Sequence, residues 1–368
     1  MDESLMVAIV MVTAAVIAFE LRISSAILEI LAGIGLAFFF VDIGNLDWLS
    51  FLANLGMLGL MFMVGFEVDV ERLRGTWRAS IIVGVSALAL PMAGVFIVAY
   101  YFFDLPILTA GLLSIGLSTT SLALVYNALR ERGTLHTERG QIIVAAASVV
   151  DVLSMICLAF LMGDVGWGTA IFLLVAVPMI IGLPHIGKWI FRRYRGSLVE
   201  FELRFLLVLL IAMGFMAEKI GGIHPAVIAF ALGIVMSEIV EEHEELEQKL
   251  KGIVFSLLAP AFFLHAGMQL NIRLMTVDLL WMASVFFVVA CGLKFLGAAL
   301  PFRWMFNVSG KVAGLLFNYR LSFGIITATV GLKVGLLTED LYAVVLLIVI
   351  ASALLPAILL HDRAAEWE

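Results

Sequence analysis

Apolar runs long enough to cross a lipid bilayer follow one another along almost the whole of the 368-residue chain. A helix needs about 20 apolar residues to span the hydrocarbon core. Hydrophobic residues make up 63% of the chain and charged residues 14%, whereas soluble domains are roughly half apolar and a quarter charged. We therefore expect an all-α polytopic protein embedded in a lipid bilayer, and not a soluble enzyme. The net charge of −7 argues against a nucleic-acid partner, which would require a basic surface.

Charges and turn residues divide the apolar runs into about thirteen predicted transmembrane spans. The N-terminus has no basic segment and no small-residue cleavage site, so its first apolar run is predicted to be a span and not a removed signal. Cys157 and Cys291 lie inside apolar runs and indicate neither a disulfide framework nor a metal cluster. The predicted spans cover residues 5–20, 24–42, 49–66, 79–103, 106–129, 140–163, 167–190, 201–218, 222–238, 252–270, 277–300, 310–333 and 340–360.

Basic residues in the loops decide whether the number of spans is odd or even, because cytoplasmic loops carry an excess of Lys and Arg. With thirteen spans, one side holds sixteen of these cations and the other only Lys219, Arg273 and Lys333. This asymmetry predicts a cell-membrane protein with its N-terminus outside and its C-terminus in the cytoplasm. The acidic stretch at residues 238–247 is then a solvated cytoplasmic helix. The sixteen cations are Arg22, Arg72, Arg74, Arg78, Arg130, Arg132, Arg139, Lys188, Arg192, Arg193, Arg195, Lys249, Lys251, Arg303, Lys311 and Arg363.

Asp151 lies in the run at residues 142–161, which otherwise holds small or apolar residues and two serines. An ionisable group in hydrocarbon is costly unless it is protonated, paired or bound to an ion. Those three states describe a site that exchanges a proton for a cation. Ser148 and Ser154 lie three residues to either side of Asp151 and share its helix face. The alternative is an aspartate that packs helices together through a permanent partner.

Two polar interruptions occur within predicted spans. The first places four hydroxyls in a row, at Ser118, Thr119, Thr120 and Ser121, and the second is the stretch at residues 318–324. Hydroxyls can satisfy backbone groups that a helix break sets free. Paired breaks at corresponding positions indicate a transporter site, and these two correspond if spans 1–6 and 8–13 are inverted repeats linked by span 7. Ordinary packing through small residues is the alternative for the first interruption.

Two further charges fall inside predicted spans. Lys294 either extends to the cytoplasmic interface, since its span ends near residue 300, or reaches the protein core and pairs with Asp151. Glu29 lies deep in the second span, as a packing residue or part of an ion funnel.

In their order along the chain, several segments resemble the monovalent cation:proton antiporters, in the branch that contains bacterial sodium/proton antiporters and the membrane parts of potassium efflux systems. The resemblance covers nearly the whole chain; no single segment is very specific, but the ordered set is. The segments are residues 29–33 (EILAG), 58–67 (LGLMFMVGFE), 117–122 (LSTTSL), 150–152 (VDV), 218–237 (EKIGGIHPAVIAFALGIVMS), 260–270 (PAFFLHAGMQL), Lys294 and 320–324 (RLSFG).

The resemblance implies a domain organisation. A core domain comprises spans 4–6 and 11–13, at residues 79–163 and 276–368, with spans 5 and 12 broken and crossing. A second domain at residues 1–78 and 200–275 forms a homodimer, and residues 164–199 hold the linker helix. The family likeness also implies elevator-like alternating access.

The resemblance also assigns residues. Asp151 matches the ion- and proton-binding aspartate of the family, and Thr119 and Thr120 match the crossing-helix positions near the ion. Lys294 matches a lysine that, in electrogenic members, pairs with a second acid just before that aspartate. Here the sequence departs from the family, because Val150 occupies the position of that second acid.

We therefore expect a secondary active transporter, not an enzyme, that exchanges Na⁺ or K⁺ for H⁺ without a cofactor. One carboxylate favours electroneutral exchange. The alternatives are the membrane module of a potassium efflux system and an ion channel, and the sequence does not choose among Na⁺, K⁺ and Li⁺. The residues expected to bind the cation and proton are Asp151, Ser118, Thr119, Thr120, Ser121, Ser148 and Ser154, with Lys294, Arg320 and Glu29 as supporting charges.

Overall fold

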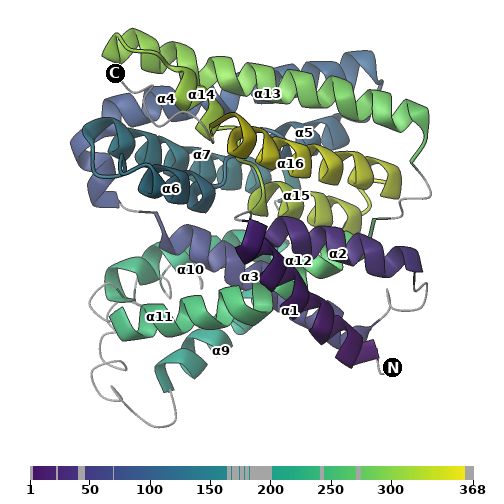
Figure 1. Ribbon diagram of the computed structural model, residues 1–368. Helices are drawn as coiled ribbons and strands as arrows, with labels where there is room; N and C mark the ends of the chain where they lie inside the picture. The colour runs from purple at the N-terminus through teal and green to yellow at the C-terminus, as the bar shows by residue number, and fades with distance from the viewer. Residues whose placement is uncertain are drawn as a thin grey trace. The chain divides into compact units, whose positions relative to one another are not determined.

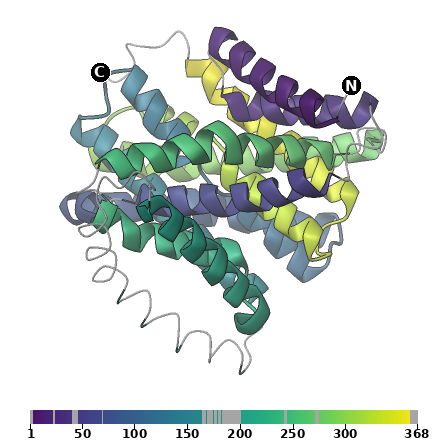
Figure 2. The same ribbon diagram turned by 90° about the horizontal axis from the view of Figure 1, so that it is seen from below.

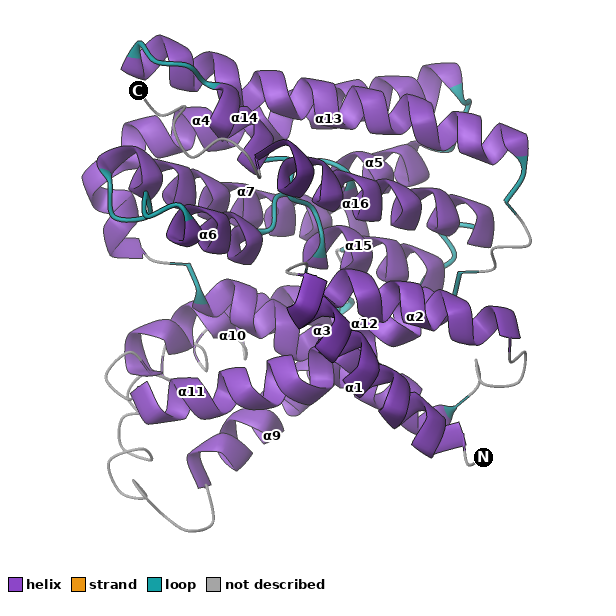
Figure 3. Ribbon diagram, in the orientation of Figure 1, coloured by secondary structure: helices purple, strands orange, loops and turns teal. Residues whose placement is uncertain are grey.

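The computed structural model describes residues 3–21, 24–39, 46–68, 70–163, 201–240, 244–270 and 275–360, together with Trp167, Leu174, Pro178 and Gly182. Within these ranges every regular element is a helix (Figure 3), which confirms the all-α prediction. Seven described helices are long and apolar enough to cross a membrane, and four shorter apolar helices accompany them.

The described helices follow the predicted spans. The span predicted at 167–190 lies almost wholly outside the described residues, so the total of thirteen stays a prediction. The helices are α1 (Glu3–Leu21), α2 (Ser25–Phe39), α3 (Asp47–Phe66), α4 (Val70–Ile97), α5 (Ile107–Gly116), α6 (Leu122–Glu131), α7 (Glu138–Met162), α9 (Phe201–Met216), α10 (Pro225–Val240), α11 (Glu244–Ile253), α12 (Ala259–Met268), α13 (Val277–Phe306), α14 (Lys311–Leu316), α15 (Ser322–Lys333) and α16 (Glu339–Leu360) (Figure 1).

Three short π-helical segments extend these helices: η2 (Val98–Phe102) follows α4, η3 (Ala217–Gly221) follows α9, and η4 (Val254–Leu258) joins α11 to α12. The residues that flank η4 have α-helical backbone angles, so α11 and α12 form one rod. The acidic stretch predicted to be a solvated helix therefore begins this rod, as far as it lies in the described residues.

The chain divides into two compact units, the first made of residues 1–44, 69–161 and 266–368 and the second of residues 45–68 and 162–265. The first unit contains two similar series of helices, α4 to α7 and α13 to α16. Their helix breaks, at residues 117–121 and 317–321, each span five residues. The assignment of helices to a core and a dimer domain stays a prediction.

Helices α4 and α13 pack along each other in opposite directions. The Ser86 hydroxyl of α4 donates to the carbonyl oxygen of Gly297 at 2.6 Å. Further along α4, a side chain at Gly94 would meet Val289 and Leu293, which precede Gly297. Since the two helices begin corresponding series, their antiparallel packing agrees with inverted repeats.

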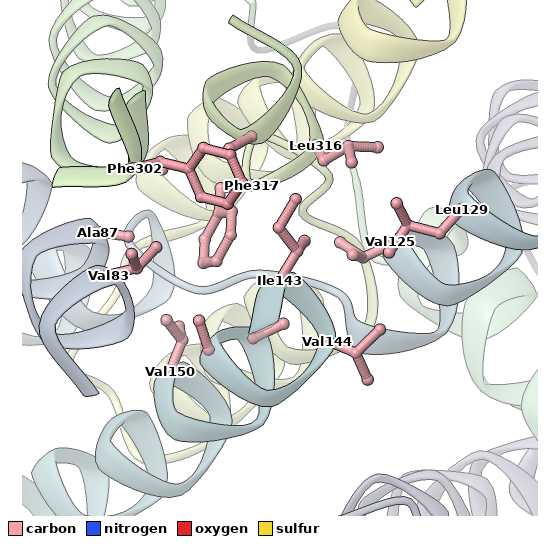
Figure 4. Packing of buried hydrophobic residues seen from close by; sticks show 14 of the residues in the cluster. Val83, Ala87, Val125, Leu129, Ile143, Val144, Val150, Phe302, Leu316 and Phe317 are labelled. Atoms are coloured by element: carbon pink, nitrogen blue, oxygen red, sulfur yellow. The ribbon is translucent and has the colours of Figure 1, made fainter. Parts of the chain in front are cut away.

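A cluster of buried hydrophobic side chains joins both series. It draws on Val83 and Ala87 of α4, Ile143 and Val150 of α7, and Phe317 at the second break, all fully buried (Figure 4). Because the cluster includes the residue directly before Asp151, the side of α7 that Val150 occupies is apolar. Burial of this kind stabilises the unit by about 25 cal/mol per Å² of apolar surface.

In the second unit, α3 packs along α10 at glycines (Figure 2). A Cβ atom at Gly65 would overlap the carbonyl oxygen of Phe230, and one at Gly233 would overlap that of Phe62. The two helices therefore approach closely enough that only glycine fits at either position.

Glu67 ends α3, and its backbone N–H donates to the carbonyl oxygen of Met63 at 3.0 Å. Its side chain lies near Glu247 and Lys251 of α11, which form an ion pair with each other. Burial raises the pKa of Glu67 to about 7; the charge of Lys251 opposes this rise and that of Glu247 adds to it.

Substitutions in α11 should move the pKa of Glu67 in opposite directions. In Lys251→Gln the opposing positive charge is lost and the pKa should rise above about 7. In Glu247→Gln a repelling negative charge is lost and the pKa should fall. Infrared titration, with Glu67→Gln identifying the Glu67 carboxyl band, measures both shifts. Shifts of the same sign in the two variants would contradict this arrangement.

Candidate functional site

The first helix break follows α5, where the hydroxyl run begins. The last turn of α5 closes with the Leu117 and Ser118 N–H groups donating to the carbonyls of Leu113 and Ile115. The Thr119 hydroxyl then donates to the carbonyl oxygen of Gly116 at 3.1 Å. Because α6 starts only after Ser121, which has an extended backbone, the hydroxyl takes over an acceptor that the ended helix leaves open.

The second break lies between α14 and α15 and is held by an amide. The Asn318 side-chain nitrogen donates to the carbonyl oxygens of Gly314, at 3.0 Å, and Cys291, at 3.3 Å. Gly314 belongs to the helix that has just ended and Cys291 to α13. Asn318 therefore fixes the end of α14 against α13.

The two breaks bind each other directly. The Ser121 N–H donates to the carbonyl oxygen of Tyr319 at 2.6 Å, and the Thr120 hydroxyl donates to that of Phe317 at 3.2 Å. A Cβ atom at Gly324 would lie 3.3 Å from the carbonyl oxygen of Gly116, so α5 and α15 approach each other closely there. The breaks predicted from sequence thus meet in one place, and each supplies partners for the other's backbone.

Two buried cations, Lys294 and Arg320, lie at the breaks. Lys294 of α13 is fully buried, and its Nζ donates to the carbonyl oxygen of Ser118. Arg320, also fully buried, donates to the carbonyl oxygen of Ala290 at 2.8 Å and to the Cys291 Sγ at 3.2 Å. Of the two interpretations of Lys294, the structure selects the one in which it reaches the protein core. Its nitrogen binds a backbone carbonyl at the end of α5, where the helix dipole is negative.

Asp151 of α7 belongs to the same group of charges. Only 1% of its surface is exposed, and it is close enough to Lys294 for their charges to attract, while Arg320 repels Lys294. The structure thus brings together one carboxylate, two cations and the two breaks.

The remaining predicted residues divide into two sets. Ser118, Ser121 and Ser154 are buried, and the hydroxyl oxygens of Ser118 and Ser154 make no hydrogen bond in the structure. The Ser148 hydroxyl donates within α7, to the carbonyl oxygen of Val144 at 3.2 Å. Glu29 is buried and hydrogen-bonded to Ser25 of its own helix, and α2 packs at Ile30 against Gly267 of α12.

Sequence reasoning did not single out Asn318 or Thr327 as site residues. Asn318 follows Ser118 by 200 residues, the offset that also relates the two breaks, so a comparison of the repeats would have found it. Thr327 of α15 is buried, and its methyl lies 3.2 Å from a Cβ built at Gly116. Nothing in the sequence marks Thr327, because its place depends on how α15 crosses α5.

Carboxylate, hydroxyl and backbone carbonyl oxygens are the groups that coordinate Na⁺ at broken helices in transporters. Here such oxygens come from Asp151, Ser118 and the backbone of both breaks. In the part of the chain that the structure describes, His, Cys, Asp and Glu do not gather in threes as metal ligands would.

Comparison with known proteins identifies the family. The model of the sodium/hydrogen exchanger transmembrane family matches residues 6–361. Among relatives, a probable Na⁺/H⁺ antiporter 3 of Methanocaldococcus jannaschii is 29% identical over 87% of this chain and 85% of its own length. The Na⁺/H⁺-K⁺ antiporter GerN of Bacillus cereus is 27% identical over 88% and 86%.

The fold matches a solved structure. The sodium proton antiporter MjNhaP1 of M. jannaschii superimposes with a TM-score of 0.67 over 98% of this chain and 95% of that one, at 14% identity. The family match covers almost every described helix, including both breaks, α7 and α13. This chain is therefore a multi-pass membrane protein of the sodium/hydrogen exchanger family.

Proposed function

We propose that this chain is a secondary active transporter that exchanges Na⁺ or K⁺ for H⁺ at Asp151. The observation that carries the proposal is a buried carboxylate next to two helix breaks. Asp151 attracts Lys294, and Lys294 binds the Ser118 carbonyl in the first of the two breaks that face each other. A carboxylate so deeply buried is stable when it is protonated or when a cation is bound. Proton and cation therefore compete for one site, which is what exchange requires.

The charges around Asp151 support one-for-one exchange. Lys294 and Arg320 both donate to backbone carbonyls, so each has an acceptor other than a carboxylate. Val150, where a second acid would stand, is fully buried in the apolar cluster with Val83 and Ala87. A single carboxylate that alternates between a proton and a monovalent cation moves no net charge.

Potassium is a second candidate for the transported ion. The relative GerN is named a Na⁺/H⁺-K⁺ antiporter, and carbonyl and hydroxyl oxygens can bind either ion. In this proposal a potassium efflux module differs only in the ion carried. A channel, in contrast, would not couple cation flux to the movement of protons.

The proposed transport cycle uses the predicted domain organisation. The helices from α4 to α7 and from α13 to α16 would form the moving core, and the others would hold a homodimer in the membrane. The N-terminus would lie outside and the C-terminus in the cytoplasm, as the loop cations indicate. No cofactor takes part; the transported cation and the proton are the only ligands proposed.

Transport in proteoliposomes tests the proposed function. The purified chain is reconstituted, and an outward gradient of Na⁺, K⁺ or Li⁺ is imposed in turn while lumenal pH is recorded. We expect one or more cations to move protons in the opposite direction. Cation flux without any proton movement would indicate a channel and contradict the proposal.

Asp151→Asn should abolish exchange, because the amide binds neither the exchanged proton nor the cation with a negative charge. The fold should be retained, since the side chains have nearly the same shape. Glu202→Gln, at a buried carboxylate on α9, is the matched control and should retain exchange. Cation-driven proton movement by purified Asp151→Asn would refute the assignment.

Replacing Thr119 and Thr120 together by Val should weaken apparent Na⁺ affinity. The two hydroxyls hold the break open, and each loss is worth on the order of 1 kcal/mol, or about fivefold in affinity. Thr109 lies at the other end of α5, and its hydroxyl donates a similar hydrogen bond to the carbonyl oxygen of Leu336. Thr109→Val removes that bond and serves as the control. Equal apparent affinities in the double variant and the wild type would show that these hydroxyls only pack.

A one-for-one cycle predicts that membrane voltage does not drive exchange. In proteoliposomes, the Na⁺ gradient at which proton flux vanishes should stay the same when a potassium diffusion potential is imposed. If that reversal point moves with voltage, the cycle carries net charge, and Lys294→Gln should then remove the voltage dependence.

A further inference from the structure

Arg78 of α4 and Arg303 of α13 lie at similar levels along two packed helices of the first unit. Ser86 bonds to Gly297, and the two helices run in opposite directions. Arg78 precedes Ser86 by eight residues and Arg303 follows Gly297 by six, which places them about 12 and 9 Å from that contact. The two arginines therefore lie within about 3 Å of the same height, on helices that pack against each other.

Large aromatic side chains accompany these arginines. Trp304 is 81% exposed and Trp77 is 52% exposed, and the Arg78 guanidinium lies 5.2 Å from the centre of the Trp77 ring. Lys311, exposed at the start of α14, follows after a short turn and packs beside α13 through its helix. We call Trp77, Arg78, Arg303, Trp304 and Lys311 the basic aromatic patch.

The surface that leads to this patch is apolar. Val288, Leu296 and Leu300 of α13 are all strongly exposed, as expected for side chains in contact with lipid tails. Tryptophan prefers the level of the lipid headgroups, so Trp304 marks the height at which the bilayer's polar layer meets α13. Arginine at that height presents a planar pair of donors to phosphate oxygens.

The opposite end of the same helix provides the contrast. Trp281 is 61% exposed and lies 23 residues before Trp304, about 35 Å along the helix, slightly more than the hydrocarbon thickness of about 30 Å. Two carboxylates lie near that end, those of Asp278 in the first turn of α13 and Asp104 after η2. Two tryptophans thus lie near the two ends of α13, with Asp278 in the same turn region as Trp281 and Arg303 next to Trp304.

We propose that the basic aromatic patch binds the phosphate headgroup of an anionic phospholipid, with Trp304 at the headgroup level and Arg78, Arg303 and Lys311 around the phosphate. The partner is a lipid in the bilayer and not a soluble phosphate, because the patch continues directly into the apolar surface of α13. A bound lipid would link α4, the end of α13 and the start of α14. Lipid binding at this patch does not depend on the proposed transport activity.

Single-tryptophan variants test this inference in the full-length protein. One variant keeps only Trp304 and the other only Trp281, with the remaining tryptophans replaced by Phe. Each is reconstituted in vesicles containing dibrominated phosphatidylglycerol or dibrominated phosphatidylcholine at equal mole fraction. Each nearby cation favours anionic lipid by up to about fivefold, so phosphatidylglycerol should quench Trp304 at least about twofold more strongly. Trp281 should show no such preference.

Charge removal provides the second measurement. Arg78→Gln, Arg303→Gln and Lys311→Gln, combined in the Trp304 variant, should abolish the preference for phosphatidylglycerol while quenching by phosphatidylcholine persists, which also shows that the protein is inserted. Inorganic phosphate added to the parent Trp304 variant in phosphatidylglycerol vesicles should not displace the lipid. Equal quenching of Trp304 by both lipids, displacement by phosphate, or a preference that survives the three substitutions would each overturn the inference.

Discussion

Every backbone N–H and C=O group buried in a membrane must find its partner within the protein, and the two helix breaks depend on how this chain meets that requirement. Ser121 donates to Tyr319 and Thr120 to Phe317 across the breaks, while Thr119 and Asn318 bind carbonyls of the helices that have just ended. The breaks stabilise each other, so neither can be altered without exposing polar groups of its partner.

Two cations donate to backbone carbonyls that the hydroxyls and the Asn318 amide do not bind. Lys294 binds the Ser118 carbonyl at the end of α5, where the helix dipole is negative, and Arg320 binds the Ala290 carbonyl within α13. The negative charge of Asp151 also attracts Lys294. A cation that came to the Ser118 carbonyl would therefore meet the Lys294 ammonium already there, and the lysine side chain would have to move first.

The sequence predicted the elements of this site better than its contacts. Asp151 and the four hydroxyls identified α7 and the first break. Such polar groups are costly in an apolar span, so each of them indicates a structural or functional requirement. The sequence did not decide where the Lys294 ammonium group lies, because a long flexible side chain can reach any acceptor that the packing of α13 provides. Ser148 lies on the face of Asp151, yet its hydroxyl binds within its own helix, an option that spacing alone cannot exclude.

Val150 shows how packing disfavours a second acid beside Asp151 in this chain. Its side chain is fully buried among Val83, Ala87 and other apolar groups of α4, α7 and α13. A carboxylate introduced there would enter an apolar cluster, at a cost of several kcal/mol unless a cation came with it. Lys294 is already bound to Ser118, and moving it would leave that carbonyl without its donor. A second acid at this position would therefore need a partner for its charge within an apolar cluster to which α4, α7 and α13 all contribute.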